Sequence, residues 1–282
     1  LPLVEDDKRP DETTTYGVGE LILDAARRGC HRIIVGLGGS ATNDAGTGAA
    51  AAIGVVFRDS EGNAFVPTGG TLSSVASIDR SQKDPVLNGV EIVTMCDIDN
   101  PLYGQQGAAY IFGPQKGADE QMVKRLDAGL RSLSEVVISD LERDISQLPG
   151  SGAAGGMGGG MVAFFDAHLE MGIEVVLDTV NFNELLTDAD MVFTGEGKLD
   201  SQSLRGKVVM GIAGRTKRKQ VPLVAVVGDI GDPIEGAYEG GVSAIFSINR
   251  VAKEFKEVIA RAPEDLARTM DNLMRFLHLL RF

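Results

Sequence analysis

Short runs of apolar residues alternate along this chain with longer segments in which apolar positions recur every three or four residues. Runs rich in Val, Ile and Leu predict strands, whereas the longer periodicity predicts helices. The predicted strands are residues 32–37, 91–96, 173–177, 191–193, 223–227 and 244–248. The runs VPLVAVVG and ADMVFTG show no polar alternation, as expected for strands covered on both faces of a parallel sheet. The pattern therefore predicts an α/β fold.

The helical periodicity falls between these strands. The predicted helices are residues 18–28, 43–52, 120–143, 158–170 and 203–217, with a terminal helix from Pro263. Gly29 and Gly54 follow the first two helices, where a left-handed C-cap is favoured. The terminal helix carries an apolar face that we expect to dock against the rest of the protein. Its members are Leu266, Met270, Leu273, Leu277 and Leu280.

Residues 148–161, LPGSGAAGGMGGGM, are uncharged and mostly glycine. One interpretation is a flexible linker, although linkers are normally polar and rich in serine. The other is a close backbone approach to a ligand followed by a helix, because the segment continues directly into the helical pattern MVAFFDAHLE. The second interpretation is favoured.

Length, net charge and cysteine content indicate the number of domains, the kinds of partner and the compartment that we expect for this protein. The 282 residues suffice for two domains, which we place at 1–165 and 166–282. A net charge of -13 argues against nucleic acid or anionic membrane as a partner. The sequence has no apolar run of the roughly 18 residues that a membrane span needs and no leader, so we expect a cytoplasmic protein. Cys30 and Cys96 lack a CxxC spacing and are expected to be buried, unpaired thiols.

The first segment with candidate chemistry is IIVGLGGSATNDAGTGAAAAIG, residues 33–54. A strand ends in a tight glycine turn and a helix follows, so free backbone amides and the helix dipole can bind an anion. It is neither a Walker loop nor a dinucleotide fingerprint, and a capped helix that binds nothing fits the spacing equally well. The candidate residues are Gly38, Gly39, Ser40, Asn43 and Asp44.

The second segment is MCDIDNPLYGQQGAAYIFGPQKGAD, residues 95–119. Carboxylates directly after a strand are often solvated turn residues, but α/β proteins bind ligands at the carboxyl ends of their strands. A tight loop with one cation follows. The candidates are Asp97, Asp99, Asn100, Gln115 and Lys116.

The third segment is VFTGEGKLDSQSLRGKVVMGIAG, residues 192–214. It combines acids and lysines beside a buried strand, which fits either surface salt bridges or a site for metal and phosphate. Phosphoryl transfer needs Mg²⁺ held by one or two carboxylates, cations or amides for the phosphates, and a group that orients the attacking hydroxyl. The candidates are Thr194, Gly195, Glu196, Lys198, Asp200, Gln202 and Lys207.

These segments together resemble the bacterial glycerate kinase family. The matching blocks are TTTYGVGELI, GLGGSATNDAGTG, CDIDNPLYGQQGAAYIFGPQKGA, GAAGGMGGG and TGEGKLDSQSLRGK. The resemblance implies an enzyme that uses ATP and Mg²⁺ to convert glycerate to phosphoglycerate. It also implies two α/β domains with the active site in the cleft between them. One is a flavodoxin-like parallel sheet flanked by helices, and the other is a smaller mixed α/β domain that carries the GGSATND loop.

With this resemblance, the candidate residues take hypothetical roles. Asp97 and Glu196 are the candidate metal ligands, while Asp200, Lys207 and Asp99 are the candidate catalytic residues. Asp200 is our choice for orienting the glycerate hydroxyl. The remaining candidates are assigned to binding of phosphate or substrate.

Family members begin with roughly a hundred further residues, including an Asp-Ser-Phe-Lys motif. We therefore expect that this chain lacks the first strand of its flavodoxin-like domain. Two kinds of alternative to a glycerate kinase stay open. The first is an inactive fragment that only binds ligand. The second is another protein of the same architecture, either a kinase for tartronate or a related hydroxy acid, or a nucleotide binder that is not a kinase. A homodimer is compatible with the sequence.

Overall fold

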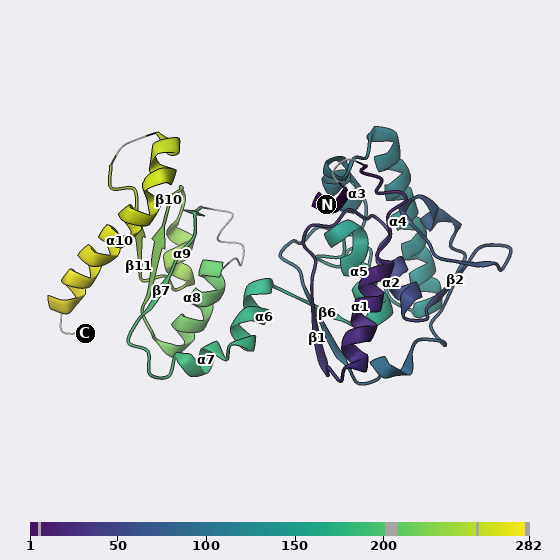
Figure 1. Ribbon diagram of the computed structural model, residues 1–282, viewed down its shortest axis with the longest axis horizontal. Helices are drawn as coiled ribbons and strands as arrows, with labels where there is room; N and C mark the ends of the chain where they lie inside the picture. Colours follow the sequence, from purple (N-terminus) through teal and green to yellow (C-terminus); the bar gives the residue numbers. More distant parts are fainter. Residues whose placement is uncertain (5–6, 201–207, 252–253, 280–282) are drawn as a thin grey trace. The chain divides into compact units, whose positions relative to one another are not determined.

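The computed structural model of the protein describes residues 1–4, 7–200, 208–251 and 254–279. The chain divides into two compact units, residues 1–170 and 171–282, shown in Figure 1. The unit that carries the GGSATND loop is the larger of the two, so the expectation of a smaller domain around this loop was wrong. The predicted domain boundary between residues 165 and 166 stays a prediction, and the two units meet five residues later in the sequence.

Unit 1 contains a parallel sheet in the order β1-β5-β6. Its strands are β1 (Arg32–Gly36), β5 (Glu91–Met95) and β6 (His168–Glu170). Val93 in the central strand pairs with Ile34 on one side and His168 on the other. The first two strands were predicted, whereas residues 168–170 were predicted as helix. The helix before β6 stops earlier because Asp166 adopts a left-handed conformation, with φ 59°.

A small antiparallel sheet, β3-β2-β4, was not predicted from the sequence. It consists of β2 (Val56–Arg58), β3 (Ala64–Phe65) and β4 (Ser77–Asp79). These strands are too short to produce a recognisable alternation. Phe57 of β2 packs edge to face on Phe164, with ring centroids 5.5 Å apart, and so joins this sheet to the core of unit 1.

The helices of unit 1 are mostly those expected. They are α1 (Tyr16–Arg27), α2 (Thr47–Ala52), α3 (Ala108–Phe112), α4 (Glu120–Leu141) and α5 (Ala153–Phe165), with the 3-10 turns η1 (Pro2–Val4), η2 (Gly69–Ser74), η3 (Pro85–Leu87) and η4 (Pro114–Lys116). Asp119 caps α4 by accepting a hydrogen bond from the amide of Met122 at 2.8 Å. The buried face of α4, including Leu126 and Leu130, lies in the core.

The glycine-rich segment leads into helix α5 and forms its first part, with a kink where Gly155 and Gly156 have positive φ, 71° and 89°, so the linker interpretation was wrong. Its glycines let the helix backbone lie against the GGSATND loop. A Cβ on Gly155 would lie 2.0 Å from the carbonyl oxygen of Thr42, and one on Gly160 would lie 2.0 Å from that of Ala45. The amide of Ala45 donates to the carbonyl of Gly155 at 3.0 Å. The close approach expected for a ligand is thus made to protein backbone.

Unit 2 is built on a parallel sheet in the order β11-β9-β7. The strands are β7 (Val192–Thr194), β9 (Leu223–Val227) and β11 (Ala244–Ser247), and β9 is buried throughout. Beyond them the short strands β8 (Lys198–Leu199) and β10 (Asp229–Ile230) pair in parallel. One apolar cluster includes residues of β9, α8 (Val208–Lys219) and α9 (Glu235–Gly240), and a second includes residues of β9 and α10 (Phe255–Leu279). This confirms parallel sheets flanked by helices.

Two elements of unit 2 differ from their prediction. Residues 173–177 were predicted as a strand but belong to α6 (Gly172–Thr179), which α7 (Phe182–Leu185) follows. The run IEVVL has high β propensity, but α6 places Glu174 and Asp178 one turn apart, where both contact the guanidinium of Arg215. Tertiary contacts thus outweigh local propensity.

The terminal helix α10 begins at Phe255 rather than at Pro263, which lies inside it. A proline after a polar segment favours a helix start, but the preceding residues continue the same amphipathic pattern. The docked face is confirmed for Met270, Leu273 and Leu277, which pack against β9 residues. Leu266 is 44% exposed, and Leu280 lies outside the described residues.

Candidate functional site

The loop after β1 stays irregular for ten residues before α2 begins at Thr47. The predicted helix start at Asn43 was therefore too early. Ala45 and Gly46 both have positive φ, 52° and 73°, which delays the helix. At Gly38 and Gly39 an added Cβ would meet no described atom within 4 Å. The backbone at these two glycines consequently borders open space and is accessible to a small ligand.

Lys116 connects this loop with the FGPQKG loop. Its ammonium donates to the hydroxyl of Ser40 at 2.6 Å and to the carbonyl of Thr42 at 2.8 Å. The residue is only 2% exposed. Burial lowers the pKa of Lys116 from 10.5 to about 8, against the opposing effect of the Asp44 charge. The two predicted anion-binding loops therefore form one cluster with a buried, titratable cation.

Asp44, a predicted ligand contact, instead holds the loop together. Its carboxylate accepts hydrogen bonds from the amide and hydroxyl of Thr15, both at 2.8 Å, and from the amide of Gly46 at 3.1 Å. The side chain is completely buried, and burial raises its pKa although these hydrogen bonds lower it. The geometry favours a positioning role for Asp44.

Asn43 is buried as well, yet neither the nitrogen nor the oxygen of its amide has a hydrogen-bond partner in the described part of the chain. An unsatisfied buried polar group costs about 1–3 kcal/mol. Such a cost is offset when water or a ligand supplies the hydrogen bond. Asn43 therefore remains a strong candidate for contact with a bound molecule.

The carboxylates after β5 lie at the same edge of the sheet as the loop after β1. Asp97 and Asp99 are exposed, and so is Gln115. Asn100 instead has a local structural role, because its side-chain amide donates to the carbonyl of Gln106 at 2.8 Å. Asp97 and Asp99 thus lie at the surface, whereas Asn100 shapes the turn.

In unit 2 the TGEGKLD loop runs beside the segment that follows β9. The amides of Gly228 and Asp229 donate to the carbonyls of Glu196 and Gly197, both at 3.0 Å. A Cβ on Gly195 would lie 2.5 Å from the carbonyl oxygen of Val226, so this position requires glycine. Thr194 ends β7 just before this contact.

The charged residues of this loop differ in their surroundings. One carboxylate oxygen of Glu196, Oε1, is buried and has no hydrogen-bond partner among residues that the structure describes. The ammonium of Lys198 lies 3.9 Å from the carboxylate of Asp200. Gln202 and Lys207 lie outside the described residues, and so does part of the predicted helix 203–217, whose described part is α8.

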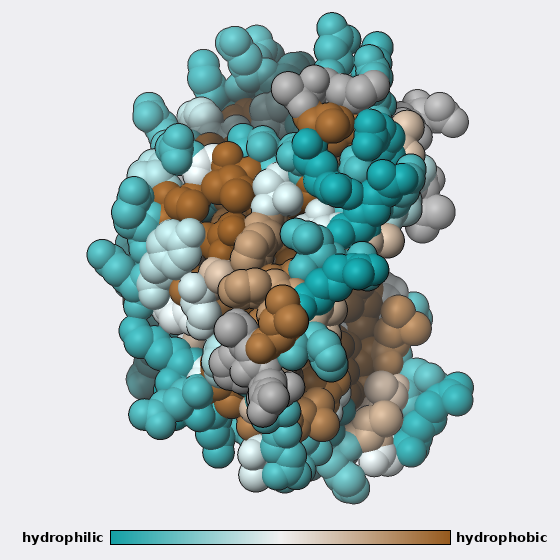
Figure 2. All heavy atoms as spheres, turned by 90° about the vertical axis from the view of Figure 1, so that its left-hand side faces the viewer, coloured by the Kyte–Doolittle hydropathy of each residue, from teal (hydrophilic) through white to brown (hydrophobic). Residues whose placement is uncertain are grey.

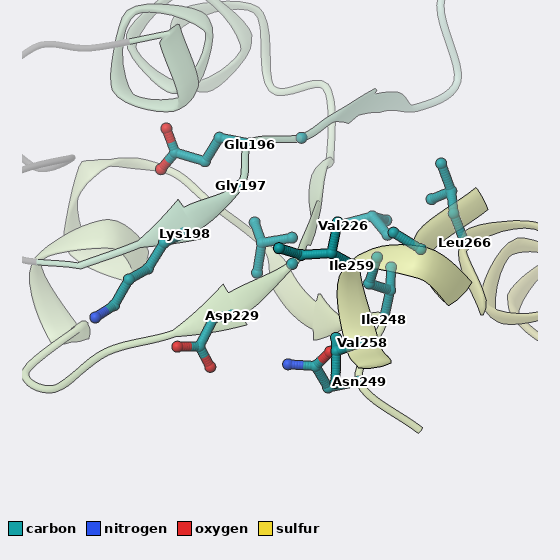
Figure 3. A pocket seen from close by; sticks show the side chains of 14 residues that line it. Glu196, Gly197, Lys198, Val226, Asp229, Ile248, Asn249, Val258, Ile259 and Leu266 are labelled. Atoms are coloured by element: carbon teal, nitrogen blue, oxygen red, sulfur yellow. The ribbon is translucent and has the colours of Figure 1, made fainter. Parts of the chain in front are cut away.

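A cavity of about 850 Å³ opens at the carboxyl ends of the unit 2 strands (Figure 3). Of its lining residues, Gly195, Glu196 and Lys198 were predicted from the sequence, whereas Gly197 between them was not. The rest of the lining was missed, although Asp229 and Asn249 follow predicted strands and could have been found by that rule. The residues from α10 carry no such signal. The missed residues are Val226, Val227, Gly228, Asp229, Ile248, Asn249, Val258, Ile259, Ala262 and Leu266.

Three further expectations concern metals, membranes and cysteines. The residues in the described ranges contain no group of three or more His, Cys, Asp or Glu side chains that could hold a metal ion. Of the described helices, none is both long and apolar enough to cross a membrane. Both cysteines are free as expected, but Cys30 is exposed, and only Cys96 is buried.

Comparisons with known proteins agree on one family. The sequence profile of the glycerate kinase family matches residues 1–278. The chain is 44% identical to a glycerate kinase of Bacillus cereus, over 94% of this chain and 70% of that protein. It is 42% identical to the glycerate 2-kinase of Escherichia coli K12, over 97% of this chain and 72% of that protein.

A solved structure gives the same result. The crystal structure of a putative glycerate kinase 2 from Salmonella typhimurium LT2 superposes with a TM-score of 0.83 and 39% identity. The alignment covers 98% of this chain and 72% of the Salmonella chain. The chain spans about seven tenths of the length of these relatives, and the expected absence of a first strand stays a prediction. The profile match and the identities show that this chain belongs to the glycerate kinase family.

Proposed function

We propose that this protein transfers the γ-phosphoryl group of ATP to a hydroxyl of glycerate and releases phosphoglycerate and ADP. The match of the glycerate kinase family over residues 1–278 carries this proposal. The curated relatives named as glycerate kinases support it over the alternative of an inactive fragment.

Unit 1 offers the means to bind a small anion. Lys116 provides a positive charge, Ser40 provides a hydroxyl beside it, and the accessible backbone at Gly38 and Gly39 provides amides. We assign this cluster to an anionic group of the reactants, with Asn43 as a further contact. A cation in a desolvated site binds a carboxylate or phosphate more strongly than one in water.

The residues present fit a magnesium ion. Mg²⁺ usually takes one or two protein carboxylates and completes its coordination with phosphates and water. The orphaned buried oxygen of Glu196 is suited to such a contact, and Asp97 is a second candidate. When bound with ATP, Mg²⁺ neutralises part of the phosphate charge.

In the reaction the glycerate hydroxyl oxygen forms a bond to the γ-phosphorus while the bond between that phosphorus and ADP breaks. We assign Asp200 to orient the hydroxyl and accept its proton, with Asp99 and Lys207 as the other catalytic candidates. Thr194, Gly195, Lys198, Gln202 and Gln115 stay candidates for phosphate contacts. A cytoplasmic location and a homodimer also stay predictions.

A coupled assay of ADP release with glycerate, ATP and Mg²⁺ tests the function, with phosphoglycerate identified by mass spectrometry. Turnover that requires glycerate supports the proposal. Faster turnover with tartronate than with glycerate would reassign the acceptor. Binding of ATP without any turnover would identify a ligand-binding fragment instead.

A further inference from the structure

The cavity of unit 2 has an apolar interior and a polar end. Val226 and Ile248 come from the ends of the parallel strands, while Ile259, Ala262 and Leu266 come from α10. In Figure 3 the side chains of Val226, Ile248, Ile259 and Leu266 lie on one side, and the carboxylates of Glu196 and Asp229 lie on the other. Figure 2 shows the face of the molecule on the α10 side, where hydrophobic side chains reach the surface between hydrophilic ones. Leu266 of α10 is 44% exposed.

The size of this cavity does not match glycerate. Pockets of about 300–1,000 Å³ typically enclose ligands of drug size, and a volume of about 850 Å³ is in the upper part of that range. Glycerate is a three-carbon acid with polar groups on every carbon, so it has no apolar part to place against Val226, Ile248 and Ile259. A planar heterocycle the size of a purine has apolar faces that can pack against these side chains.

The charge of the cavity also argues against a small acid. Glu196 and Asp229 contribute two carboxylates to the lining and Lys198 contributes one ammonium, which lies 3.9 Å from Asp200. In Figure 3 the Lys198 ammonium points away from the apolar side chains. The carboxylate of an acid substrate would meet an environment that is mainly apolar or negative, which disfavours its binding.

The polar end fits a ribose. Asp229 is exposed and lies two residues after the end of the buried strand β9, separated from it by Gly228. In open parallel sheets, ligands bind outside the carboxyl ends of the strands, and an acidic residue there commonly accepts hydrogen bonds from ribose hydroxyls. Asn249 lies at the same end of the cavity and offers an amide as a further hydrogen-bonding group.

We infer that this cavity binds the adenosine part of the nucleotide, with the base between the strand ends and α10 and the ribose at Asp229. The assignment rests on the proposed function, because the nucleotide is the phosphoryl donor of that reaction. It leaves the Lys116 cluster of unit 1, with its buried cation, for the acid substrate. Each unit then binds one of the two reactants.

The test measures binding of ADP to the full chain by equilibrium dialysis, without glycerate, so that it does not depend on turnover. Ala262→Trp fills the cavity, and Ala260→Trp is its matched control, because Ala260 is an exposed residue of α10 that does not line the cavity. Ile259→Asp is a second variant at a side chain 56% exposed, so it places a charge beside the base with little risk to folding. Circular dichroism melting verifies the fold of each variant.

We expect Ala262→Trp and Ile259→Asp to raise the Kd for ADP about tenfold or more, a loss of about 1.4 kcal/mol, while Ala260→Trp leaves it unchanged. Asp229→Ala should weaken ADP but not its 2′,3′-dideoxy analogue. Folded cavity variants that bind ADP normally would overturn the assignment, even if the wild type phosphorylates glycerate. If the wild type instead binds ADP in this cavity but leaves glycerate unchanged, the proposed function fails and the binding site stands.

Discussion

The ammonium of Lys116 lies 2.6 Å from the hydroxyl of Ser40, although 76 residues separate the two in sequence. This contact joins two loops, neither of which offers a complete anion-binding site by itself. The GGSATND loop offers backbone amides and a hydroxyl, and the FGPQKG loop offers one cation. Because the Lys116 ammonium is buried, water and salt screen its charge less than they screen the charge of a surface lysine. The pair is therefore the most informative place to perturb the protein.

Lys116 should give the activity a dependence on pH. Its pKa is about 8, so it loses its proton as the pH rises through this value and no longer attracts an anion. We expect the KM for glycerate to rise about tenfold between pH 7 and pH 9, while kcat changes less. Lys116→Met should have a high KM at every pH and no such transition. Lys124→Met is the matched control, since Lys124 is exposed on α4. A transition that persists in Lys116→Met would exclude this lysine as its origin.

The same lysine should affect stability with the opposite trend. Its pKa in the folded protein, about 8, is lower than the 10.5 of an unperturbed lysine, so between these values the unfolded chain binds more protons. Stability consequently rises with pH in this window, by about 3 kcal/mol at most. Urea unfolding of wild type and Lys116→Met at pH 7, 8, 9 and 10 measures the difference. The wild type should gain stability relative to the variant as the pH increases, and a constant difference would contradict the assignment.

Sequence patterns predicted the strand framework well because buried parallel strands need continuous apolar runs. Residues 223–227 form β9 as predicted, and residues 91–96 form β5 with a difference of one residue at the end. The same rule failed at 173–177, because an apolar run of this length is also compatible with a helix. Here the helix is favoured by ion pairs of Glu174 and Asp178 with Arg215, which belongs to α8. Local sequence does not include such contacts.

The candidate site was predicted only in part for a related reason. The rule that ligands bind after parallel strands pointed to Glu196 and Lys198, which line the unit 2 cavity. The opposite wall comes from α10, and nothing in its pattern separates a residue that docks, such as Leu273, from one that lines the cavity, such as Ala262. Likewise Asp44 and Asn43 are adjacent cap-type residues. Only their surroundings show that one is fully hydrogen-bonded and the other is not.

Gly155 should be intolerant of even a methyl group. A Cβ there would lie 2.0 Å from the carbonyl oxygen of Thr42, and the residue has φ 71°. We expect Gly155→Ala to lower the free energy of unfolding by about 3 kcal/mol or more, because both strain and a backbone clash must be relieved. Gly62→Ala isolates the first effect, since Gly62 has φ 88° but no described atom within 4 Å of its Cβ position. This control should lose about 1 kcal/mol. Equal losses in urea unfolding would show that packing against Thr42 is unimportant.

Asp44 should matter for folding more than for substrate binding. In Asp44→Asn the new amide nitrogen would face N–H donors, because the carboxylate accepts from Thr15 and Gly46. We expect a loss of about 3 kcal/mol in the free energy of unfolding. Asp59→Asn is a control of the same type, because Asp59 also accepts from backbone amides but is only partly buried, so its loss should be smaller. A variant that folds as well as the wild type but has a raised KM for glycerate would instead assign Asp44 to the substrate.

Glu196 should determine the requirement for magnesium. Its buried oxygen Oε1 has no protein partner within the described ranges, so an isosteric amide removes the charge without breaking a hydrogen bond of that oxygen. We expect Glu196→Gln to raise the Mg²⁺ concentration for half-maximal activity about tenfold or more, with the KM for glycerate unchanged, because a neutral amide is a weaker ligand for Mg²⁺. Glu235→Gln, at an exposed position in the first turn of α9, removes the same charge from unit 2 away from the cavity and should have no effect. Titration of activity with Mg²⁺ at saturating ATP and glycerate makes the comparison. If both variants shift the titration equally, net charge rather than a specific contact is responsible, and if neither does, Glu196 is not a ligand of the metal.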